Sequence, residues 1–284
     1  MLVDTVDAPV ISAEFNLDEV LLLQNMLKVG AFPTVLEIWP PRDYFEDEIR
    51  VAAEAEARES LSDKGVITGG EVTEATVAQW MRVLQRPDVE LAARIWREGA
   101  QLGLTVCRRG ALHVVAMRYR DLITIQHLNS RAEVTSIAQV IAPVLGALGE
   151  AVPATFEPIN LLVADGAAID RRVAEGSDYY TELLHAGVAE PSARFLTEAL
   201  RDRDQVWRSE IVAIEYVPGN QILSKASVGV FDTPAGRIVA APSLALDGTM
   251  WSTFAPGTNG RLVSSTELIV ETLPSASWFS AVRH

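Results

Sequence analysis

The stretch AGRIVAAPSLALDGTMWSTFAPGT, residues 235–258, decides how the C-terminal part of this chain is expected to fold. Two runs rich in apolar residues, 236–244 and 248–255, meet at the turn-forming pair Asp247 and Gly248, which predicts two antiparallel strands. The stretch also holds several hydroxyl groups and an aspartate, but no histidine. The mouth of an active site and the corner of a sheet would both have this composition, so the rest of the chain has to decide between them.

An earlier part of the sequence contains the same turn pattern. Gly110 opens the third strand of an earlier predicted run, and Asp121 stands in the turn before the fourth strand. Gly236 and Asp247 hold the same two places in the later run, and Gly110 is as far from Gly236 as Asp121 is from Asp247. Helices are expected on both sides of each run. The pattern predicts an internal duplication with a pseudo-two-fold axis, and it assigns Asp247 to a turn rather than to catalysis.

Hydrophobic periodicity divides the chain into helices and strands. Asn16 and Glu19 form a predicted capping box for the first helix, and Asn160 and Ser177 are expected to cap two later helices. The helices are expected at 17–30, 42–65, 74–85, 133–149, 160–176, 177–187, 190–202 and 259–273. The strands are expected at 32–41, 88–96, 104–110, 111–119, 121–128, 205–217, 221–233, 236–244 and 248–255. This order predicts an α+β fold with an N-terminal half, 1–149, and a C-terminal half, 150–284.

The composition is that of a globular protein. The chain has 284 residues, of which 49% are hydrophobic, and this is enough for one large domain or two fused halves. No apolar run reaches the roughly 18 residues that cross a bilayer, and the acidic start does not fit a signal peptide. We therefore expect a cytoplasmic protein that does not insert into membranes. Its one cysteine, Cys107, permits no internal disulfide and no cysteine metal cluster.

An excess of acidic residues gives the chain a net charge of −14, which argues against binding to the phosphate backbone of nucleic acid. The acids concentrate in residues 42–65. Two ion pairs one turn apart, Glu46 with Arg50 and Glu54 with Arg58, together with an apolar stripe, predict a helix there with one solvated face. The stripe consists of Phe45, Ile49, Ala52, Ala53, Ala57 and Leu61.

Motifs for catalysis, metal binding and phosphate binding are absent from the sequence. The four histidines stand far apart and none lies in an H-E-x-x-H pattern, so each is expected to be structural or on the surface. No G-x-S-x-G sequence presents a serine, and Cys107 is expected to be a packed thiol within a strand. Neither a P-loop nor a dinucleotide fingerprint occurs. We expect no catalytic residue, no metal and no cofactor.

The residues alone leave other functions open. Paired carboxylates, Asp165 with Asp170 and Asp202 with Asp204, would support a small-molecule enzyme only if they faced each other across a cleft. Large aromatic side chains, if exposed, would anchor a protein partner, or a second copy of the chain in a self-associating structural protein. These side chains belong to Tyr179, Tyr180, Phe195, Trp207, Phe231, Trp251 and Phe254.

Several segments together resemble one family, the EspG proteins, which are cytosolic chaperones of mycobacterial type VII (ESX) secretion systems. The segments are GAFPTVLEI (30–38), TVAQWMRVLQRPD (76–88), VCRRGALHVVAMR (106–118), VGVFDTPAGRIVAAPSLALDGTMWSTFAPGT (228–258) and LPSASWF (273–279). No single motif among them is catalytic. Their order and distribution extend the resemblance over nearly the whole chain, as one continuous domain from residue 13 to residue 279.

The resemblance implies a pseudo-symmetric α+β fold with a central antiparallel sheet flanked by two helical subdomains. It also implies a function, which is to bind the apolar tip of a PPE protein in a PE-PPE heterodimer, to keep that substrate soluble and to direct it for export. In the family the partner surface involves the sheet, a loop that corresponds here to residues 96–103, and helices that correspond to those between Asn160 and Arg203. We expect partner contacts from Arg97, Leu102, Leu161, Leu162, Tyr180, Leu184 and Phe195. Homodimerisation of the free protein stays open.

Overall fold

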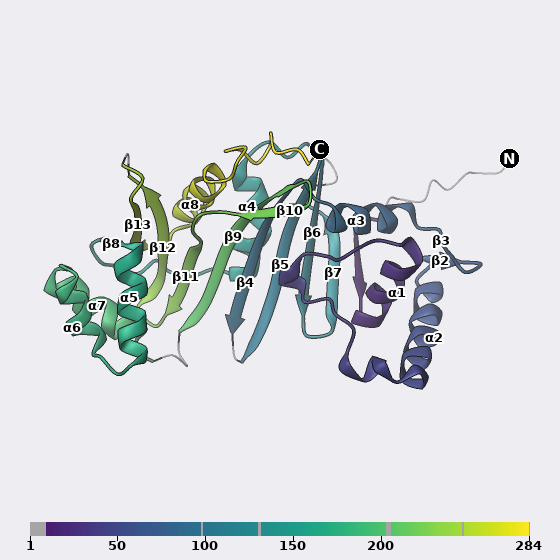
Figure 1. Ribbon diagram of the computed structural model, residues 1–284, viewed down its shortest axis with the longest axis horizontal. Helices are drawn as coiled ribbons and strands as arrows, with labels where there is room; N and C mark the ends of the chain where they lie inside the picture. Colours follow the sequence, from purple (N-terminus) through teal and green to yellow (C-terminus); the bar gives the residue numbers. More distant parts are fainter. Residues whose placement is uncertain (1–9, 98, 130–131, 203–205, 246, 284) are drawn as a thin grey trace. The chain divides into compact units, whose positions relative to one another are not determined.

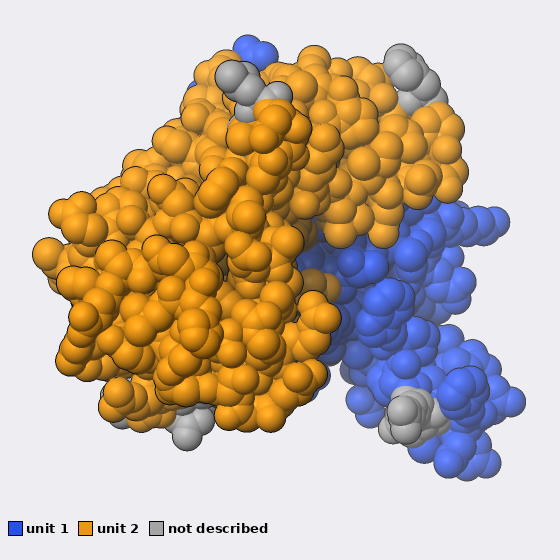
Figure 2. Space-filling view, turned by 60° about the vertical axis from the view of Figure 1, so that its left-hand side comes forward, with its two compact units in different colours: residues 1–90, 102–134 blue, residues 91–101, 135–284 orange. Residues whose placement is uncertain are grey.

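The computed structural model of the chain describes residues 10–97, 99–129, 132–202, 206–245 and 247–283. It is an α+β structure with a large antiparallel sheet, as the sequence predicts (Figure 1). The chain forms two compact units, coloured separately in Figure 2: unit 1 comprises residues 1–90 and 102–134, and unit 2 comprises residues 91–101 and 135–284. Within the described ranges, no helix combines the length and the apolar character needed to cross a bilayer.

Unit 1 combines α-helices with an antiparallel array of strands. The strands follow the order β1-β7-β6-β5, and β2 and β3 form a small separate hairpin. The elements of this part of the chain are β1 (Ser12–Phe15), α1 (Leu17–Leu27), η1 (Thr34–Leu36), η2 (Arg42–Phe45), α2 (Asp47–Asp63), β2 (Ile67–Thr68), β3 (Glu71–Val72), α3 (Ala75–Gln85), β5 (Ala100–Arg109), β6 (Leu112–Tyr119) and β7 (Leu122–His127).

Unit 2 contains the second meander and the remaining helices. Its strands follow the order β4-β9-β11-β12-β13-β8, and the short β10 pairs with β9. The elements are β4 (Val89–Arg97), α4 (Ile137–Leu148), β8 (Ile159–Leu162), α5 (Val163–Ala174), α6 (Tyr179–His185), α7 (Glu190–Leu200), β9 (Trp207–Val217), β10 (Asn220–Leu223), β11 (Val228–Thr233), β12 (Gly236–Leu244), β13 (Met250–Pro256) and α8 (Asn259–Glu271).

The two units share one strand order. The series β5-β6-β7-β1 in unit 1 has the same succession of antiparallel neighbours as β11-β12-β13-β8 in unit 2. In both series the outer strand leads directly into a helix, α1 or α5. Gly110 and Gly236, at the corresponding turns, both have a positive φ, which favours glycine. These parallels are compatible with the predicted duplication, and the pseudo-two-fold axis stays a prediction.

Helix α1 begins as the sequence predicts. The Asn16 side chain accepts a hydrogen bond from the Glu19 backbone N–H at 2.8 Å, and the Asn16 N–H donates to the Glu19 carboxylate at 2.7 Å. The same carboxylate, which is fully buried, is paired with the Lys64 ammonium at 2.7 Å. The capping box therefore also ties the start of α1 to the end of α2.

Several expectations about local structure are wrong. Residues 34–36 form a 3-10 turn instead of a strand, because Pro33, like Pro40 and Pro41, offers no N–H to a strand ladder. Residues 221–233 form two strands, β10 and β11.

Two predicted helix caps are also incorrect. Asn160 lies within β8, where its side-chain oxygen accepts from the Thr253 hydroxyl at 2.7 Å, and α5 starts three residues later. Asp178, not Ser177, caps α6, because its carboxylate accepts from the Thr181 N–H at 2.9 Å. In both places the strand or the cap depends on a partner that single-residue preferences do not reveal.

The apolar stripe predicted for residues 45–61 is buried only at its C-terminal end. Ala57 and Leu61 are in the core, but Phe45 is 92% exposed and Ile49 is 38% exposed. Phe45 belongs to η2, before the helix begins, so it does not share the helical periodicity of the stripe. This end of α2 is consequently more apolar on its surface than the sequence suggests.

Side chains along β9 and β11 point alternately to the two faces of the unit 2 sheet. Ser209, Ile211 and Ala213 are buried on one face, while Arg208 and Glu210 point to the other face and are at least partly exposed. Residues of β11 follow the same rule, with Val228 and Val230 buried. Helices α4 and α8, which contact each other, cover the buried face, whereas the opposite face of β9 has no helix among its described contacts.

The buried Arg237 side chain connects several elements of unit 2. Its guanidinium forms a bidentate pair with Asp232 across the β11-β12 hairpin, at 2.5 and 2.9 Å. It also donates to the backbone carbonyls of Leu148 and Gly149, at 3.0 and 3.1 Å, and thereby satisfies the C-terminal end of α4. Arg237 is 1% exposed, so these bonds are formed away from water and hold α4 against the sheet.

We expect Arg237→Met to destabilise the protein strongly. The substitution leaves the partly buried Asp232 carboxylate without its main partner and exposes unsatisfied carbonyls of α4, so the cost should be about 3 to 5 kcal/mol. Urea unfolding followed by circular dichroism measures it. Arg194→Met is the control, since its pair with Glu190 is 61% and 63% exposed and solvent screening should leave it little effect on stability. Equal midpoints for the two variants would contradict the structural role of Arg237.

Candidate partner-binding surface

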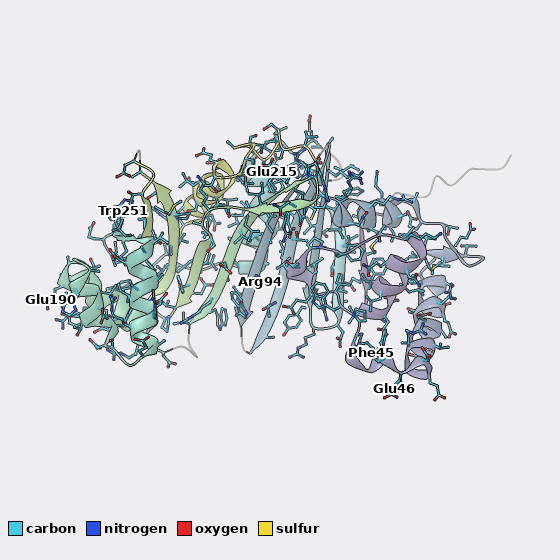
Figure 3. All side chains as sticks on the ribbon, in the orientation of Figure 1. Phe45, Glu46, Arg94, Glu190, Glu215 and Trp251 are labelled. Carbon is cyan, nitrogen blue, oxygen red and sulfur yellow. The ribbon has the colours of Figure 1, made fainter. Side chains whose placement is uncertain are left out.

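The open face of the unit 2 sheet is formed by alternate residues of β4, β9 and β11. Arg97 of β4 contacts both Asp232 and the Trp207 ring, which are direct neighbours on the covered face. Residues one or three positions before Arg97 therefore point to the opposite, open face. These are Arg94, which Figure 3 labels, and Trp96, which is 39% exposed.

Phe231 and Arg208 continue this open face toward the next strands. The two residues are direct neighbours across the β9-β11 pair, so they share a side of the sheet. Phe231 stacks on Phe254 with ring centroids 6.4 Å apart, and both rings pack partly against the core of α5, α6 and α7. The open sheet face thus passes directly into the helical part of unit 2.

Helices α5, α6 and α7 gather at the β8-β13 edge of the unit 2 sheet (Figure 1). They share one apolar core with the sheet, and the partly buried side chains around it include Phe156, Tyr179, Tyr180 and Phe195. The core consists of Ala154, Ile159, Leu161, Ile169, Leu183, Val188, Ala193, Leu196, Ala199 and Ile238. A sheet face beside an apolar helical cluster is a suitable place for another polypeptide to bind.

Polar contacts hold the ends of helices in the α5, α6 and α7 cluster and connect neighbouring helices. Arg172 of α5 pairs with Glu182 of α6 at 2.6 Å, and the Glu182 side chain is only 11% exposed. Hydrogen bonds from Thr181 lower the pKa of the Asp178 carboxyl, which caps α6. Phe195 of α7 stacks on Phe156 with centroids 4.5 Å apart. The apolar side chains on this cluster are therefore held on a preorganised frame.

Tyr180, Leu184 and Phe195 lie together in this helical cluster, as expected from the sequence. Tyr180 and Phe195 are half-buried and pack against the shared core. Leu184 is 37% exposed, one turn after Tyr180 on α6. All three keep surface that a partner can reach.

The structure corrects the expected contact surface at Leu161, whose side chain is buried. It is only 4% exposed, because the α5, α6 and α7 cluster covers its side of β8. Leu162 points to the opposite side of the sheet, opposite Trp251 of β13, since neighbouring strand residues alternate. The two leucines are thus not on one surface, and Leu161 is not accessible to a partner in this conformation.

Arg97 and Leu102 do not belong to the helical cluster. The Arg97 guanidinium donates to the Leu148 carbonyl, pairs with Asp232 at 3.4 Å and lies 4.5 Å from the Trp207 ring centroid, so it is occupied within unit 2. Leu102 belongs to unit 1, where it pairs with Tyr119. Residues 96–103 are mostly strand rather than loop, since β4 ends at 97 and β5 begins at 100. Glu98 of that segment and Arg203 at the end of the helical region lie outside the described residues.

Trp96, Arg94 and Arg208 are surface residues that the sequence reasoning did not select. The signal for them is the alternation in β4, VELAARIWR, in which Leu91, Ala93 and Ile95 are buried and the intervening positions lie on the other face. The sequence predicts the strand, but which face of the strand is exposed depends on where α4 and α8 pack.

The ionisable groups of the structure give no support to catalysis. Burial raises the pKa of the Cys107 thiol well above its usual value, so the thiol is not activated. Burial lowers the pKa of His113 to about 4, and burial together with Asp170 raises that of Tyr179. Asp165 and Asp170 are exposed helix residues, Asp204 lies outside the described residues, and no metal-binding group of histidine, cysteine or carboxylate side chains occurs among those described.

Comparison with known proteins identifies the family. The model of the EspG family matches residues 16–266. The chain belongs to the EspG family. This membership places the chain in a family of secretion chaperones and not in an enzyme family, so the carboxylate-enzyme alternative is set aside.

Curated relatives carry EspG names in several secretion systems. The chain is 33% identical over 270 residues to the ESX-3 secretion-associated protein EspG3 of Mycolicibacterium smegmatis, an alignment that covers 94% of this chain and 89% of the relative. It is 30% identical over 273 residues to the ESX-1 secretion-associated protein EspG1 of Mycobacterium tuberculosis, covering 95% and 90% of the two chains. The identity is thus spread over both units.

A solved structure with the same fold is the Mycobacterium tuberculosis type VII secretion system chaperone EspG5, in complex with the PE25-PPE41 dimer. The TM-score is 0.77, and the match covers 95% of this chain and 99% of EspG5. Since the sequence identity is 20%, this similarity establishes the shared fold.

We expect Leu161→Ala and Leu184→Ala to differ in their effect on stability. Leu161 is enclosed by the helical core, so truncation should cost about 2 to 5 kcal/mol, whereas the exposed Leu184 should change the free energy of unfolding by no more than about 0.5 kcal/mol. Denaturant unfolding of the two variants beside the unmodified protein measures both. A small effect for Leu161→Ala would return this residue to the candidate surface.

Proposed function

We propose that this chain is a cytosolic chaperone of a type VII secretion system that binds the apolar tip of a PPE protein in a PE-PPE heterodimer. It keeps this substrate soluble and directs it for export. The observation that carries the proposal is the shared fold with EspG5, which was solved in complex with a PE25-PPE41 dimer. Family membership over residues 16–266 adds to it.

The surface of unit 2 fits this task chemically. An exposed apolar tip on a secreted protein favours aggregation, and burial against a second protein removes that surface from water. Trp96, Phe231, Tyr180, Leu184 and Phe195 offer partly exposed apolar area on the open sheet face and the adjoining helices. Aromatic side chains of this kind contribute most of the binding free energy at protein interfaces.

Charged residues on the same face support discrimination between substrates. Arg94 and Arg208 stand on the open sheet face beside Trp96 and Phe231. A partner with carboxylates around its apolar tip would pair with them, and a partner with basic residues there would be repelled. Such a rim allows related chaperones to select different substrates through the same fold.

We expect Leu184→Glu to abolish capture of the substrate without unfolding the chaperone. The new carboxylate would be desolvated in the interface, which should weaken binding by at least about tenfold. Co-expression with the PE-PPE pair encoded beside the chaperone's secretion locus, followed by co-purification and calorimetry, measures the effect. Circular dichroism establishes whether the variant is folded.

Leu268→Glu is the matched control for this experiment. Leu268 is 39% exposed, close to the 37% of Leu184, but it lies on α8, which covers the opposite face of the sheet. This variant should bind like the unmodified protein. Equal losses in both variants would contradict the proposed surface, and failure of the unmodified protein to bind every such pair would contradict the proposed function.

A further inference from the structure

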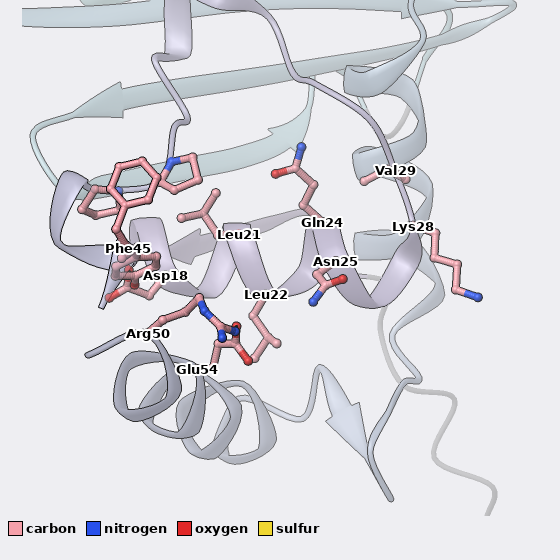
Figure 4. Close-up of a pocket in the computed structure, with 13 residues that line it drawn as sticks. Asp18, Leu21, Leu22, Gln24, Asn25, Lys28, Val29, Phe45, Arg50 and Glu54 are labelled. Carbon is pink, nitrogen blue, oxygen red and sulfur yellow. The ribbon is translucent and has the colours of Figure 1, made fainter. Parts of the chain in front are cut away.

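Unit 1 contains a groove of about 820 Å³ between α1, the segment before α2, and α2 itself (Figure 4). Leu21 and Leu22 of α1 and Phe45 of η2 line it, together with Pro40 and Pro41. The groove lies wholly within unit 1, so it does not belong to the surface proposed above for the PPE protein.

Several polar side chains that line the groove are already bonded, whereas Lys28, which also lines it, is exposed. Arg50 pairs with Asp47 at 2.8 Å and with Glu54 at 3.2 Å, rather than with Glu46 as the sequence predicts. The Tyr44 hydroxyl donates to the Asp18 carboxylate. With Arg50, Glu54 and Asp18 paired, the lining offers a partner its apolar walls and the Lys28 ammonium.

Large apolar side chains next to the groove are turned toward solvent. Phe45 is 92% exposed and Val51 is 57% exposed, and Trp39, which precedes the two lining prolines, is 52% exposed. Ile49 adds a further apolar side chain at 38% exposure. Apolar surface of this extent around a groove is typical of a protein interaction site.

The N-terminal end of α2 places acidic residues beside this site. The helix contains only two basic residues, Arg50 and Arg58, and Arg50 is already paired. The exposed acids at this end of the helix, next to Phe45, are Glu46, Asp47 and Glu48. A second copy of the chain, with the same net charge of −14, would bring like charges together, whereas a basic partner is attracted.

We propose that the unit 1 groove binds a basic amphipathic helix of a protein partner. Bulky apolar side chains on one face of that helix enter between Leu21, Leu22 and Phe45, and lysine or arginine side chains beside them face the acids of α2. The chaperone then has two separate binding surfaces, one in each unit.

A fluorescein-labelled helical peptide of leucine and lysine, roughly 18 residues long, tests this proposal by fluorescence anisotropy on the full chain. It should bind, and an equally long peptide of leucine and glutamate should not. Phe45→Ala should weaken binding about tenfold, because it removes an exposed anchor. An ionic strength of about 1 M, where charges are screened beyond about 3 Å, should also weaken binding.

Leu223→Ala is the matched control, since Leu223 is 52% exposed but lies in unit 2. It should leave peptide binding unchanged. Equal affinity of the Phe45→Ala and Leu223→Ala variants would overturn the proposal, because the peptide would then bind to acidic surface in general. Light scattering that shows a dimer dissociated by Phe45→Ala would overturn it in favour of a second copy.

The same variants separate this inference from the proposed function. Phe45→Ala should still capture the PE-PPE pair, and Leu184→Glu should still bind the leucine-lysine peptide. If Leu184→Glu lost both ligands, the two surfaces would not be independent and the groove proposal would be wrong. Loss of PE-PPE binding alone in that variant leaves the groove proposal supported.

Discussion

The buried Arg237 guanidinium is the interaction on which the organisation of unit 2 depends. One side chain holds the Asp232 carboxylate of the neighbouring strand and the last carbonyls of α4. By fixing α4 on one face, it leaves Trp96 and Phe231 pointing to the other face of the sheet. The Asp232 carboxylate also accepts from Arg97, so the same centre reaches the strand that carries Trp96. A polar contact inside the sheet thus determines which aromatic side chains remain on its surface.

Much of the fold could be predicted from local patterns. The capping box of Asn16 and Glu19, and the antiparallel strands on either side of the Asp247 turn, follow from short-range rules that the structure confirms. One error occurs where a distant residue decides the outcome. Asn160 has the preference of a helix cap, yet its place is set by Thr253, almost a hundred residues later, across the β8-β13 pair. The residues around Asn160 do not reveal that Thr253 is its partner.

The candidate surface was harder to predict, because it depends on the faces of strands and not only on their positions. Leu161 and Leu162 look alike in the sequence, but the alternation of β8 sends one into the core and the other to the opposite face. Tyr180, Leu184 and Phe195 could be chosen because the family resemblance points to the helices between Asn160 and Arg203, and all three keep accessible surface there. Trp96 could not, since its exposure follows from the packing of α4 and α8 onto β4 and β9.

The burial of Cys107 has a practical consequence. The thiol is fully enclosed in β5 and its pKa is raised, so an alkylating reagent can reach it only when the strand leaves its neighbours. Because the chain has one cysteine, each labelled molecule records one opening event. The rate of alkylation therefore measures local unfolding at a single place, without any engineered probe.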